Sequence, residues 1–352
     1  MLGLRLERGP APLWLRALIP VVAILITFLI VSVLIVAAGA NPLETFYQLL
    51  IVPLTKSSQR AELLVKVTPL LLTGVAVTFA FASGYYNIGA EGQLLAGALA
   101  AAWIGRQFEF GSPWVAIPAM ILGSFLAGML WALSPALLKV RLGVDEVVTT
   151  LLLNSVMLFF ITALLNGPWR NDAGWPQSPD IFPAAQFPQL FERTRIHLGF
   201  VIAVVALLVL WWVFTRTRFG LEVRAAGIGP VAARFMGVRV GRVMLMAALI
   251  SGGIAGLAGA SEVAGVHFHL IDAISGGYGY TGIIIATLGA LTGPGVALAA
   301  LFIALLDIGI LSTSRELGIP VYLGDVIQAC LLLVALATLL LNRYSFRRIQ
   351  RD

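Results

Sequence analysis

ALIPVVAILITFLIVSVLIVAA, residues 17–38, is an almost uninterrupted apolar run. The segments at 198–214 and 326–341 have the same character, and each is close to the roughly 20 residues that a helix needs to cross a bilayer core. Of the 352 residues, 59% are hydrophobic and 11% are charged, compared with about 25% charged in a soluble domain. These observations predict an all-α polytopic membrane protein.

Counting the apolar runs predicts about ten transmembrane helices. They lie at residues 17–38, 63–83, 91–106, 114–137, 147–165, 198–214, 243–263, 279–292, 296–313 and 324–341. The first run exceeds the roughly 7 to 15 residues of a signal-peptide core, so it is interpreted as a retained span. Residues 166–196 form the longest polar stretch, and their prolines predict an extracytoplasmic loop. We therefore expect one transmembrane domain over residues 1–352.

The basic residues indicate an orientation, because Lys and Arg are retained on the cytoplasmic side of a membrane. They cluster before the first run, after the fourth, between residues 215 and 242, and at the C-terminal end. In a ten-span topology with both termini in the cytoplasm, all of these clusters fall on one side. The net charge of +6 is thus interpreted as a topology signal, and no nucleic-acid partner is expected.

Two glycine-rich stretches interrupt the apolar sequence. Residues 83–89 read SGYYNIG and residues 275–282 read SGGYGYTG. In the ten-span topology they fall toward opposite faces of the membrane, as do the broken helices of inverted repeats beside the substrate path in many transporters. The alternative is two ordinary turns.

The sequence carries no recognisable catalytic or metal site. No lysine follows a glycine, so there is no G-x-x-x-x-G-K phosphate loop and no cofactor is expected on this chain. His267 and His269 are two residues apart, which places them on different sides of a helix, and His197 and the single cysteine, Cys330, stand alone. Because no nucleophile is paired with a base, we do not expect an enzyme.

Polar residues recur on one face of the fifth predicted span. Glu146, Thr150 and Asn154 are four residues apart, which forms a stripe on a helix. Polar side chains within a membrane span face a pathway or a partner helix, so Thr150 and Asn154 are candidate substrate-pathway residues. For Glu146 we favour a place in the first turn, where a carboxylate complements the helix dipole.

The stretch from Asn87 to Gln93 supplies a second polar set. Asn87 and Gln93 carry both donors and acceptors, which recognition of a base or a sugar hydroxyl requires. Glu91 lies beside glycines. Its carboxylate either contacts the substrate or braces a broken helix by accepting hydrogen bonds from free amides, and bracing is the interpretation that we favour.

Residues around the second break complete the candidate pathway. Tyr278 and Tyr280, with Phe268 and Thr281 nearby, are able to stack on a flat base or sugar face. The alternative for the aromatic residues is a belt at the outer membrane interface.

The segment between residues 215 and 242 is the most informative cytoplasmic loop. Pro230 suits the first turn of a helix, and the residues after it offer small and apolar surface beside arginines. A short amphipathic helix parallel to the membrane would suit docking into a groove of a partner. The alternative is a basic anchor on the inner face.

Four motifs resemble the permeases of ATP-driven importers of the ribose, branched-chain amino acid and nucleoside branch. They are NIGAEGQ at 87–93, DEVVTT at 145–150 followed by Asn154, SGGIAGLAGASEVAG at 251–265 together with GYGYTGI at 277–283, and the AAG, P, AA and G pattern at 225–237. Gly229 stands where the family usually has Asn, which weakens an expected N-cap, and Tyr86 stands where Phe is common.

The resemblance implies a type II-like ABC importer permease with inverted repeats and a cytoplasmic coupling helix. It implies that ATPase subunits contact residues of the basic loop, namely Ala225, Ala226, Gly227, Pro230, Ala233, Arg234, Met236 and Gly237. It further implies an identical or related second permease in a bacterial inner membrane. ATP would be bound by the ATPase subunits, and an extracytoplasmic binding protein would deliver a nucleoside or a small sugar.

The alternative from another class is an ion-coupled secondary transporter of a small polar solute. Asp307 lies mid-span without an evident partner in the sequence, and either it or Glu91 would be the titrating group. The basic loop discriminates between the two classes, because a secondary transporter has no ATPase to dock.

Overall fold

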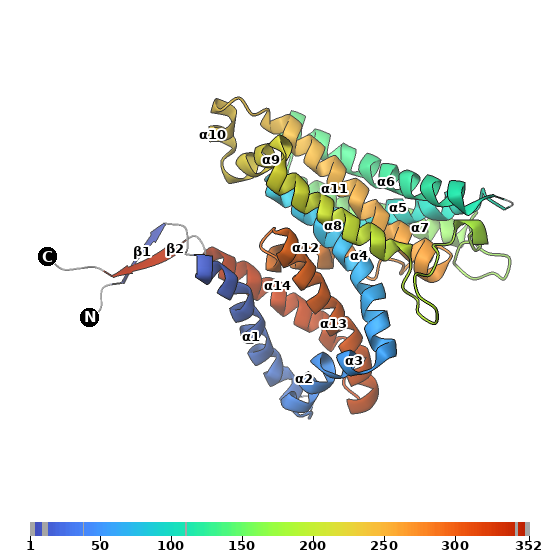
Figure 1. The fold of residues 1–352 in the computed structure, drawn as a ribbon, viewed down its shortest axis with the longest axis horizontal. Coiled ribbons are helices and arrows are strands. Elements are labelled where there is room, and N and C mark those ends of the chain that lie inside the picture. The colour runs from blue at the N-terminus through green and yellow to red at the C-terminus, as the bar shows by residue number, and fades with distance from the viewer. Residues whose placement is uncertain (1–3, 9–12, 38, 110, 342–343, 349–352) are drawn as a thin grey trace. The chain divides into compact units, whose positions relative to one another are not determined.

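The computed structural model describes residues 4–8, 13–37, 39–109, 111–341 and 344–348, and most of these residues are helical (Figure 1). The chain divides into two compact units. Unit one comprises residues 1–54 and 305–352, and unit two comprises residues 55–304. Both units are built from apolar helices, as the composition predicts.

The predicted count of ten spans is not confirmed. Among the described residues, six helices are long and apolar enough to cross a membrane, or up to seven if the bent pair Val21–Ala37 and Pro42–Thr55 is one span. Every predicted span coincides with a helix, although residue 38 lies outside the described residues. The clearest shortfalls are the spans predicted at 91–106 and 279–292, because the helices there have only 16 and 11 residues. Each of these short helices restarts the chain after a glycine-rich break.

Unit one joins the two ends of the described chain. Its elements are β1 (Leu4–Arg8), α1 (Leu13–Ala37), α2 (Pro42–Leu50), the start of α3 (Val52–Thr55), the end of α13 (Gly293–Leu317), α14 (Leu323–Leu341) and β2 (Tyr344–Arg348). Helix α1 packs against α14, and β1 pairs antiparallel with β2. Gln328 on α14 donates a hydrogen bond of 2.6 Å to Asp307 on α13, so Asp307 has a partner that the sequence did not reveal.

Unit two holds the remaining helices. They are α4 (Ser57–Ala82), α5 (Ala90–Gly105), α6 (Pro113–Leu137), the π-helix η1 (Leu138–Leu142), α7 (Glu146–Asn166), the 3-10 turn η2 (Pro183–Ala185), α8 (Leu198–Arg216), α9 (Arg218–Ile228), α10 (Pro230–Phe235), α11 (Val240–Glu262), the π-helix η3 (Val263–His267) and α12 (Tyr278–Leu288). Helix α11 packs against α4, α5 and α6, and α4 also packs against α8 and α12.

Glycines permit close packing of α11 against α5 and α6. A side chain on Gly256 would overlap the backbone of Ser124 on α6, and one on Gly97 of α5 would overlap Gly256 itself. Gly128 of α6 faces the carbonyl of Gly252 in the same way. Backbone contacts of this kind replace the hydrophobic effect as the source of helix association inside a membrane.

The predicted loop at 166–196 is ordered by contacts with the chain after η3. Ser178 N donates to Leu270 O at 2.9 Å, and Ile181 N donates to Phe268 O at 2.8 Å. Ile181 and Phe187 are buried in a cluster with residues of α5, α6 and α11. The loop therefore covers one end of unit two as a packed cap.

Candidate functional site

The two glycine-rich breaks meet inside unit two. Glu91, in the first turn of α5, is 7% exposed. One carboxylate oxygen accepts a hydrogen bond from the Ser275 hydroxyl, and the other accepts from Gly279 N at 2.8 Å. Gly279 belongs to the first turn of α12, so the carboxylate caps a helix that begins after the other break. This is the geometry of the bracing interpretation.

Asn87 organises the first break from within. Its side-chain amide donates to Gln93 Oε1 at 2.8 Å and to Ser251 Oγ at 2.9 Å. Its oxygen accepts from Gly89 N at 2.9 Å and from Gln93 Nε2 at 3.1 Å. Asn87, Gln93 and Ser251 are all buried, so these groups satisfy one another and the backbone in the absence of water. Ser251, on α11, is a member that the sequence did not suggest.

The stripe on α7 reaches the same junction. Thr150 Oγ1 accepts from Ile88 N at 3.3 Å, and Asn154 Oδ1 accepts from Gly92 N at 2.9 Å. Asn154 Nδ2 donates to Ile88 O at 2.9 Å and to the Tyr280 hydroxyl at 3.2 Å. Asn154 thus contacts both breaks. The structure brings together the polar residues predicted from three separate parts of the sequence, and we call this group the junction: Asn87, Glu91, Gln93, Thr150, Asn154, Ser251, Ser275 and Tyr280.

Tyr280 is the junction residue with an accessible side chain, at 41% exposure, whereas Asn87, Gln93, Thr150 and Asn154 are each 2% exposed or less. Its hydroxyl is held by Asn154, while much of the side chain remains open for contact. A tyrosine whose hydroxyl is fixed by a hydrogen bond and whose ring is accessible is suited to stacking against a flat or ring-shaped solute.

The other predicted residues near the second break lie in different surroundings. Tyr278 is 8% exposed, and its hydroxyl accepts a hydrogen bond of 3.0 Å from Lys66 Nζ on α4. Thr281 bonds to the carbonyl of Gly277 within its own helix. Phe268 packs against the buried cluster beneath the cap formed by residues 167–197, and its backbone is left-handed, with φ of 63°.

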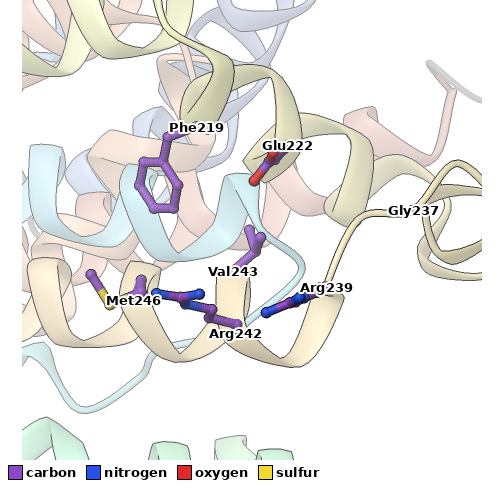
Figure 2. Close-up of a pocket in the computed structure, with 7 residues that line it drawn as sticks. All are labelled: Phe219, Glu222, Gly237, Arg239, Arg242, Val243 and Met246. Atoms are coloured by element: carbon purple, nitrogen blue, oxygen red, sulfur yellow. The ribbon is translucent and has the colours of Figure 1, made fainter.

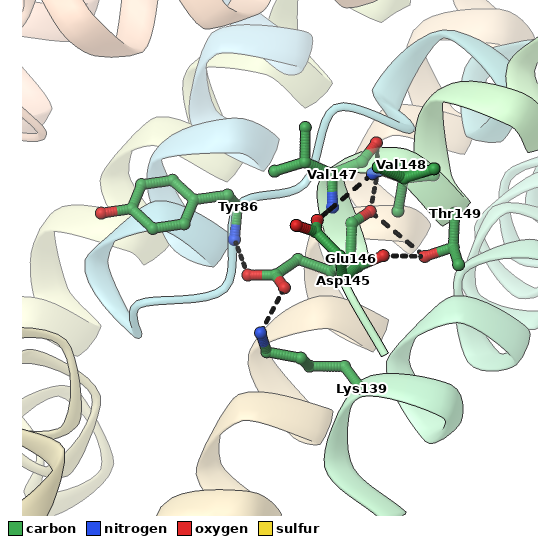
Figure 3. Close-up of polar contacts among 8 residues, drawn as sticks. Tyr86, Lys139, Asp145, Glu146, Val147, Val148 and Thr149 are labelled. Carbon is green, nitrogen blue, oxygen red and sulfur yellow. Dashed lines mark hydrogen bonds and ion pairs between the residues drawn. The ribbon is translucent and has the colours of Figure 1, made fainter. Parts of the chain in front are cut away.

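A second buried carboxylate lies beside the first break (Figure 3). Glu146, 3% exposed at the first position of α7, forms an ion pair of 2.5 Å with Lys139 on η1. Its other oxygen accepts from Tyr86 N at 3.3 Å. Asp145 caps the same helix by accepting from Val147 N at 2.8 Å. Glu146 is therefore in the predicted first turn, and its partner Lys139 was not predicted.

The predicted coupling residues form a helical hairpin of α9 and α10. Ala226 and Ala233 are buried, and a side chain on Gly227 would overlap the carbonyl of Ala82 at the end of α4. Ala225 is half-buried, whereas Pro230, Arg234, Met236 and Gly237 are exposed. The buried alanines and Gly227 thus fasten the hairpin, and the exposed members present its outer surface.

The outer surface of this hairpin is strongly apolar. Ile228 and Phe235 are each 89% exposed, Met236 is 72% exposed and Val231 is 64% exposed. We call these four residues the hairpin surface. Clustered exposed apolar side chains of this size are typical of a protein-binding surface. Ile228, Val231 and Phe235 were not among the predicted coupling residues, although the amphipathic pattern of the segment contained them.

The chain matches one protein-family model, described as "Branched-chain amino acid transport system / permease component", over residues 59–336. The match covers both breaks, the α7 stripe and the α9–α10 hairpin.

Three relatives extend the comparison. The chain is 36% identical to the glucose ABC transporter permease protein TsgB13 of Haloferax volcanii, over 96% of this chain and 91% of the relative. It is 34% identical to the guanosine ABC transporter permease protein NupP of Bacillus subtilis, over 77% and 79%. It is 28% identical to the nucleoside ABC transporter permease protein NupB of Lactococcus lactis, over 90% of each chain.

Proposed function

The chain belongs to the branched-chain amino acid transport system permease family and is a multi-pass ABC transporter permease subunit, and on this premise we propose that it forms the translocation path for nucleosides or related small sugars. The observation that carries the proposal is the junction, where residues of both glycine-rich breaks and of α7 join around buried hydrogen bonds.

The chemistry of the junction supports a polar, ring-shaped solute. Tyr280 offers an exposed ring next to a buried amide and several hydroxyl groups. The relatives are named for glucose, guanosine and nucleosides, and all of these are ring compounds with several hydroxyl groups. We favour nucleosides, because NIGAEGQ at 87–93 resembles the nucleoside permeases more than the ribose permeases.

Partner subunits supply the energy in this proposal. ATPase subunits dock on the hairpin surface, where Arg234 lies beside Phe235 and Met236, and they bind and hydrolyse ATP. A second permease, identical or related, completes the path, and an extracytoplasmic binding protein delivers the solute. In this proposal the exposed ring of Tyr280 faces the path, and the buried hydrogen bonds of the junction hold the two breaks beside it.

The same proposal places the chain in a bacterial inner membrane with both termini in the cytoplasm. Ten crossings return the C-terminus to the side of the N-terminus. In two of them, the short helices α5 and α12 cross the membrane together with the glycine-rich breaks that precede them, and these two parts form the inverted repeats. The antiparallel pairing of β1 with β2 supports an even number of crossings.

The ion-coupled alternative receives less support. Both candidate titrating groups already have partners within the protein, since Glu91 is bonded to Ser275 and Gly279, and Asp307 to Gln328. The similarity to ABC transporter permeases extends over most of the chain.

The proposal is tested by uptake into proteoliposomes in which the chain is combined with its partner ATPase, a second permease and a binding protein. We expect uptake of a labelled nucleoside that requires ATP inside the vesicle. Uptake of glucose without nucleoside uptake would overturn the substrate assignment. Uptake driven by a proton or sodium gradient without ATP would overturn the transport class.

A further inference from the structure

A pocket of about 390 Å³ lies between α9 and the start of α11 (Figure 2). Three charged residues line it: Glu222 on α9, and Arg239 and Arg242 at the start of α11. Three apolar residues line it as well: Phe219, Val243 and Met246. Its volume is within the range of small-ligand sites, about 300 to 1,000 Å³.

The three charged side chains of this pocket have no ion-pair partner among the described residues. In particular, within the described part of the chain, no ion pair joins Glu222 to Arg239 or Arg242. Both arginines are exposed, and Glu222 is half-buried. A carboxylate and two guanidinium groups therefore line one cavity with their hydrogen-bonding capacity available to a ligand that carries both charges.

The apolar part of the pocket continues into a membrane span. Val243 and Met246 lie on α11 just after Arg242, and α11 with η3 forms a candidate span from Val240 to His267. Val243 is buried, and Met246 is 43% exposed. The arginines thus stand at the end of a span, where lipid headgroups lie, and the exposed methionine follows one turn further along it.

We propose that this pocket binds a phospholipid of the phosphatidylethanolamine class. Arg239 and Arg242 hold the phosphate, because guanidinium groups match phosphate oxygens in geometry and charge. Glu222 accepts hydrogen bonds from the ammonium group. The glycerol and the upper acyl chains lie over the exposed side chain of Met246, which a free phosphate or a soluble headgroup would leave uncovered.

The location gives the lipid a role in linking the hairpin to the membrane. The pocket joins α9, which carries the hairpin, to α11, the central helix of unit two. A bound headgroup would bridge the two elements through Glu222 on one side and the arginines on the other. This inference goes beyond the proposed transport function, and its failure would leave the substrate assignment unchanged.

The test is native mass spectrometry of the delipidated full-length chain with dioleoyl-phosphatidylethanolamine, the matching phosphatidylglycerol, or free phosphoethanolamine. We expect the wild type to retain phosphatidylethanolamine in preference to the other two. The double substitution Arg239→Gln and Arg242→Gln should weaken binding about tenfold or more, since each basic group near a membrane surface contributes to lipid attraction. Glu222→Gln should abolish the preference for phosphatidylethanolamine over phosphatidylglycerol.

Arg218→Gln is the matched control, because Arg218 is an exposed arginine of α9 that does not line the pocket. It should bind lipid as the wild type does. Unchanged lipid binding in the double variant, or an unchanged preference in Glu222→Gln, would overturn the proposal. So would a double variant that keeps its lipid but loses the co-purified ATPase subunit, because the pocket would then be part of the ATPase interface.

Discussion

Glu91 Oε2 accepts a hydrogen bond of 2.8 Å from the backbone nitrogen of Gly279, 188 residues later in the chain. The bond joins the first turns of two short helices, and each of these helices restarts the chain after a break. The carboxylate of Glu91 therefore holds the start of α5 against the start of α12, at the ends of the two glycine-rich breaks.

Replacing Glu91 should loosen this junction. Glu91→Ala leaves the Gly279 amide and the Ser275 hydroxyl without an acceptor, and a buried unsatisfied group costs about 1 to 3 kcal/mol. We expect a lower midpoint in thermal unfolding of the purified chain and slower uptake. Glu91→Gln keeps one carbonyl acceptor and should lie between Glu91→Ala and the wild type. The exposed Glu109→Gln is the control, and equal stability of Glu91→Ala and this control would contradict the bracing role.

Charged substitutions on the hairpin surface should uncouple transport. Val231→Asp with Phe235→Asp places carboxylates where apolar contact with an ATPase is proposed, while both side chains are more than half exposed and leave the fold intact. We expect loss of the co-purified ATPase subunit, or ATP hydrolysis that no longer responds to substrate. Phe191→Asp, in the loop at 166–196, replaces an apolar residue that is 61% exposed and serves as the control. Normal ATP-driven uptake by the double variant would remove the hairpin from the docking site.

Substitutions at the two glycines of the hairpin should have different effects, one mainly on the stability of the chain and the other mainly on coupling to the ATPase. A side chain on Gly227 would overlap the Ala82 carbonyl, so Gly227→Val should destabilise the chain itself. Gly237 faces open space but has a φ of +84°, and a side chain there costs roughly 1 kcal/mol in strain. Gly237→Val should therefore reduce coupling and should lower the stability of the chain less than Gly227→Val does, because strain is not joined there by steric overlap. Equal stability of the two variants would contradict this distinction.

The Lys139–Glu146 pair should show a measurable coupling energy. Its carboxylate side chain is 4% exposed and its ammonium side chain 30%, so solvent screens the pair only in part. A double-mutant cycle with Lys139→Met and Glu146→Gln should give about 1 kcal/mol or more. The pair of Arg195 and Glu62, at 3.5 Å and 54% and 39% exposed, should give close to zero. Equal coupling energies for the two pairs would show that burial does not strengthen the Lys139–Glu146 ion pair.

His197 should make the cap formed by residues 167–197 sensitive to acid. Burial, aided by the charge of Arg195, lowers the pKa of His197 from 6.5 to about 4. Between pH 6.5 and 4 the unfolded chain binds a proton on His197 that the folded chain excludes. The free energy of unfolding therefore has its full value above pH 6.5 and decreases as the pH falls toward 4, by about 3 kcal/mol at most. His197→Asn keeps an acceptor for Gly199 N, which His197 Nδ1 bonds at 3.1 Å, and should flatten the unfolding midpoint between these pH values. An unchanged pH profile in this variant would assign the acid sensitivity to other groups.

Local sequence patterns predicted every member of the junction except Ser251 and Ser275, and they did not predict its hydrogen bonds. Helical spacing placed Thr150 and Asn154 on one face of α7, and glycines marked both breaks. Which amides those side chains would meet depends on how α5, α7 and α12 pack. Ser251 and Ser275 were missed for that reason, since a lone serine in a glycine-rich stretch gives no signal until a partner helix is placed beside it.

Each predicted apolar run coincides with a helix, but the number of runs did not give the number of membrane crossings. The runs at 91–106 and 279–292 are apolar enough for a span, yet α5 and α12 are too short to cross a bilayer alone. A broken helix and an unbroken one have similar composition, so hydropathy does not separate them. The partner of Asp307 was also hidden, because Gln328 is far along the chain on another helix.

The glycine contacts of α11 limit how this chain is able to move. Gly97, Gly128 and Gly256 meet backbone against backbone, so a movement of α11 against α5 or α6 that brought a side chain to these contacts would be sterically blocked. Movement of α5, α6 and α11 together keeps the glycine contacts intact. These three helices should therefore keep their mutual packing during the transport cycle, and access should alternate through displacement of the elements around them.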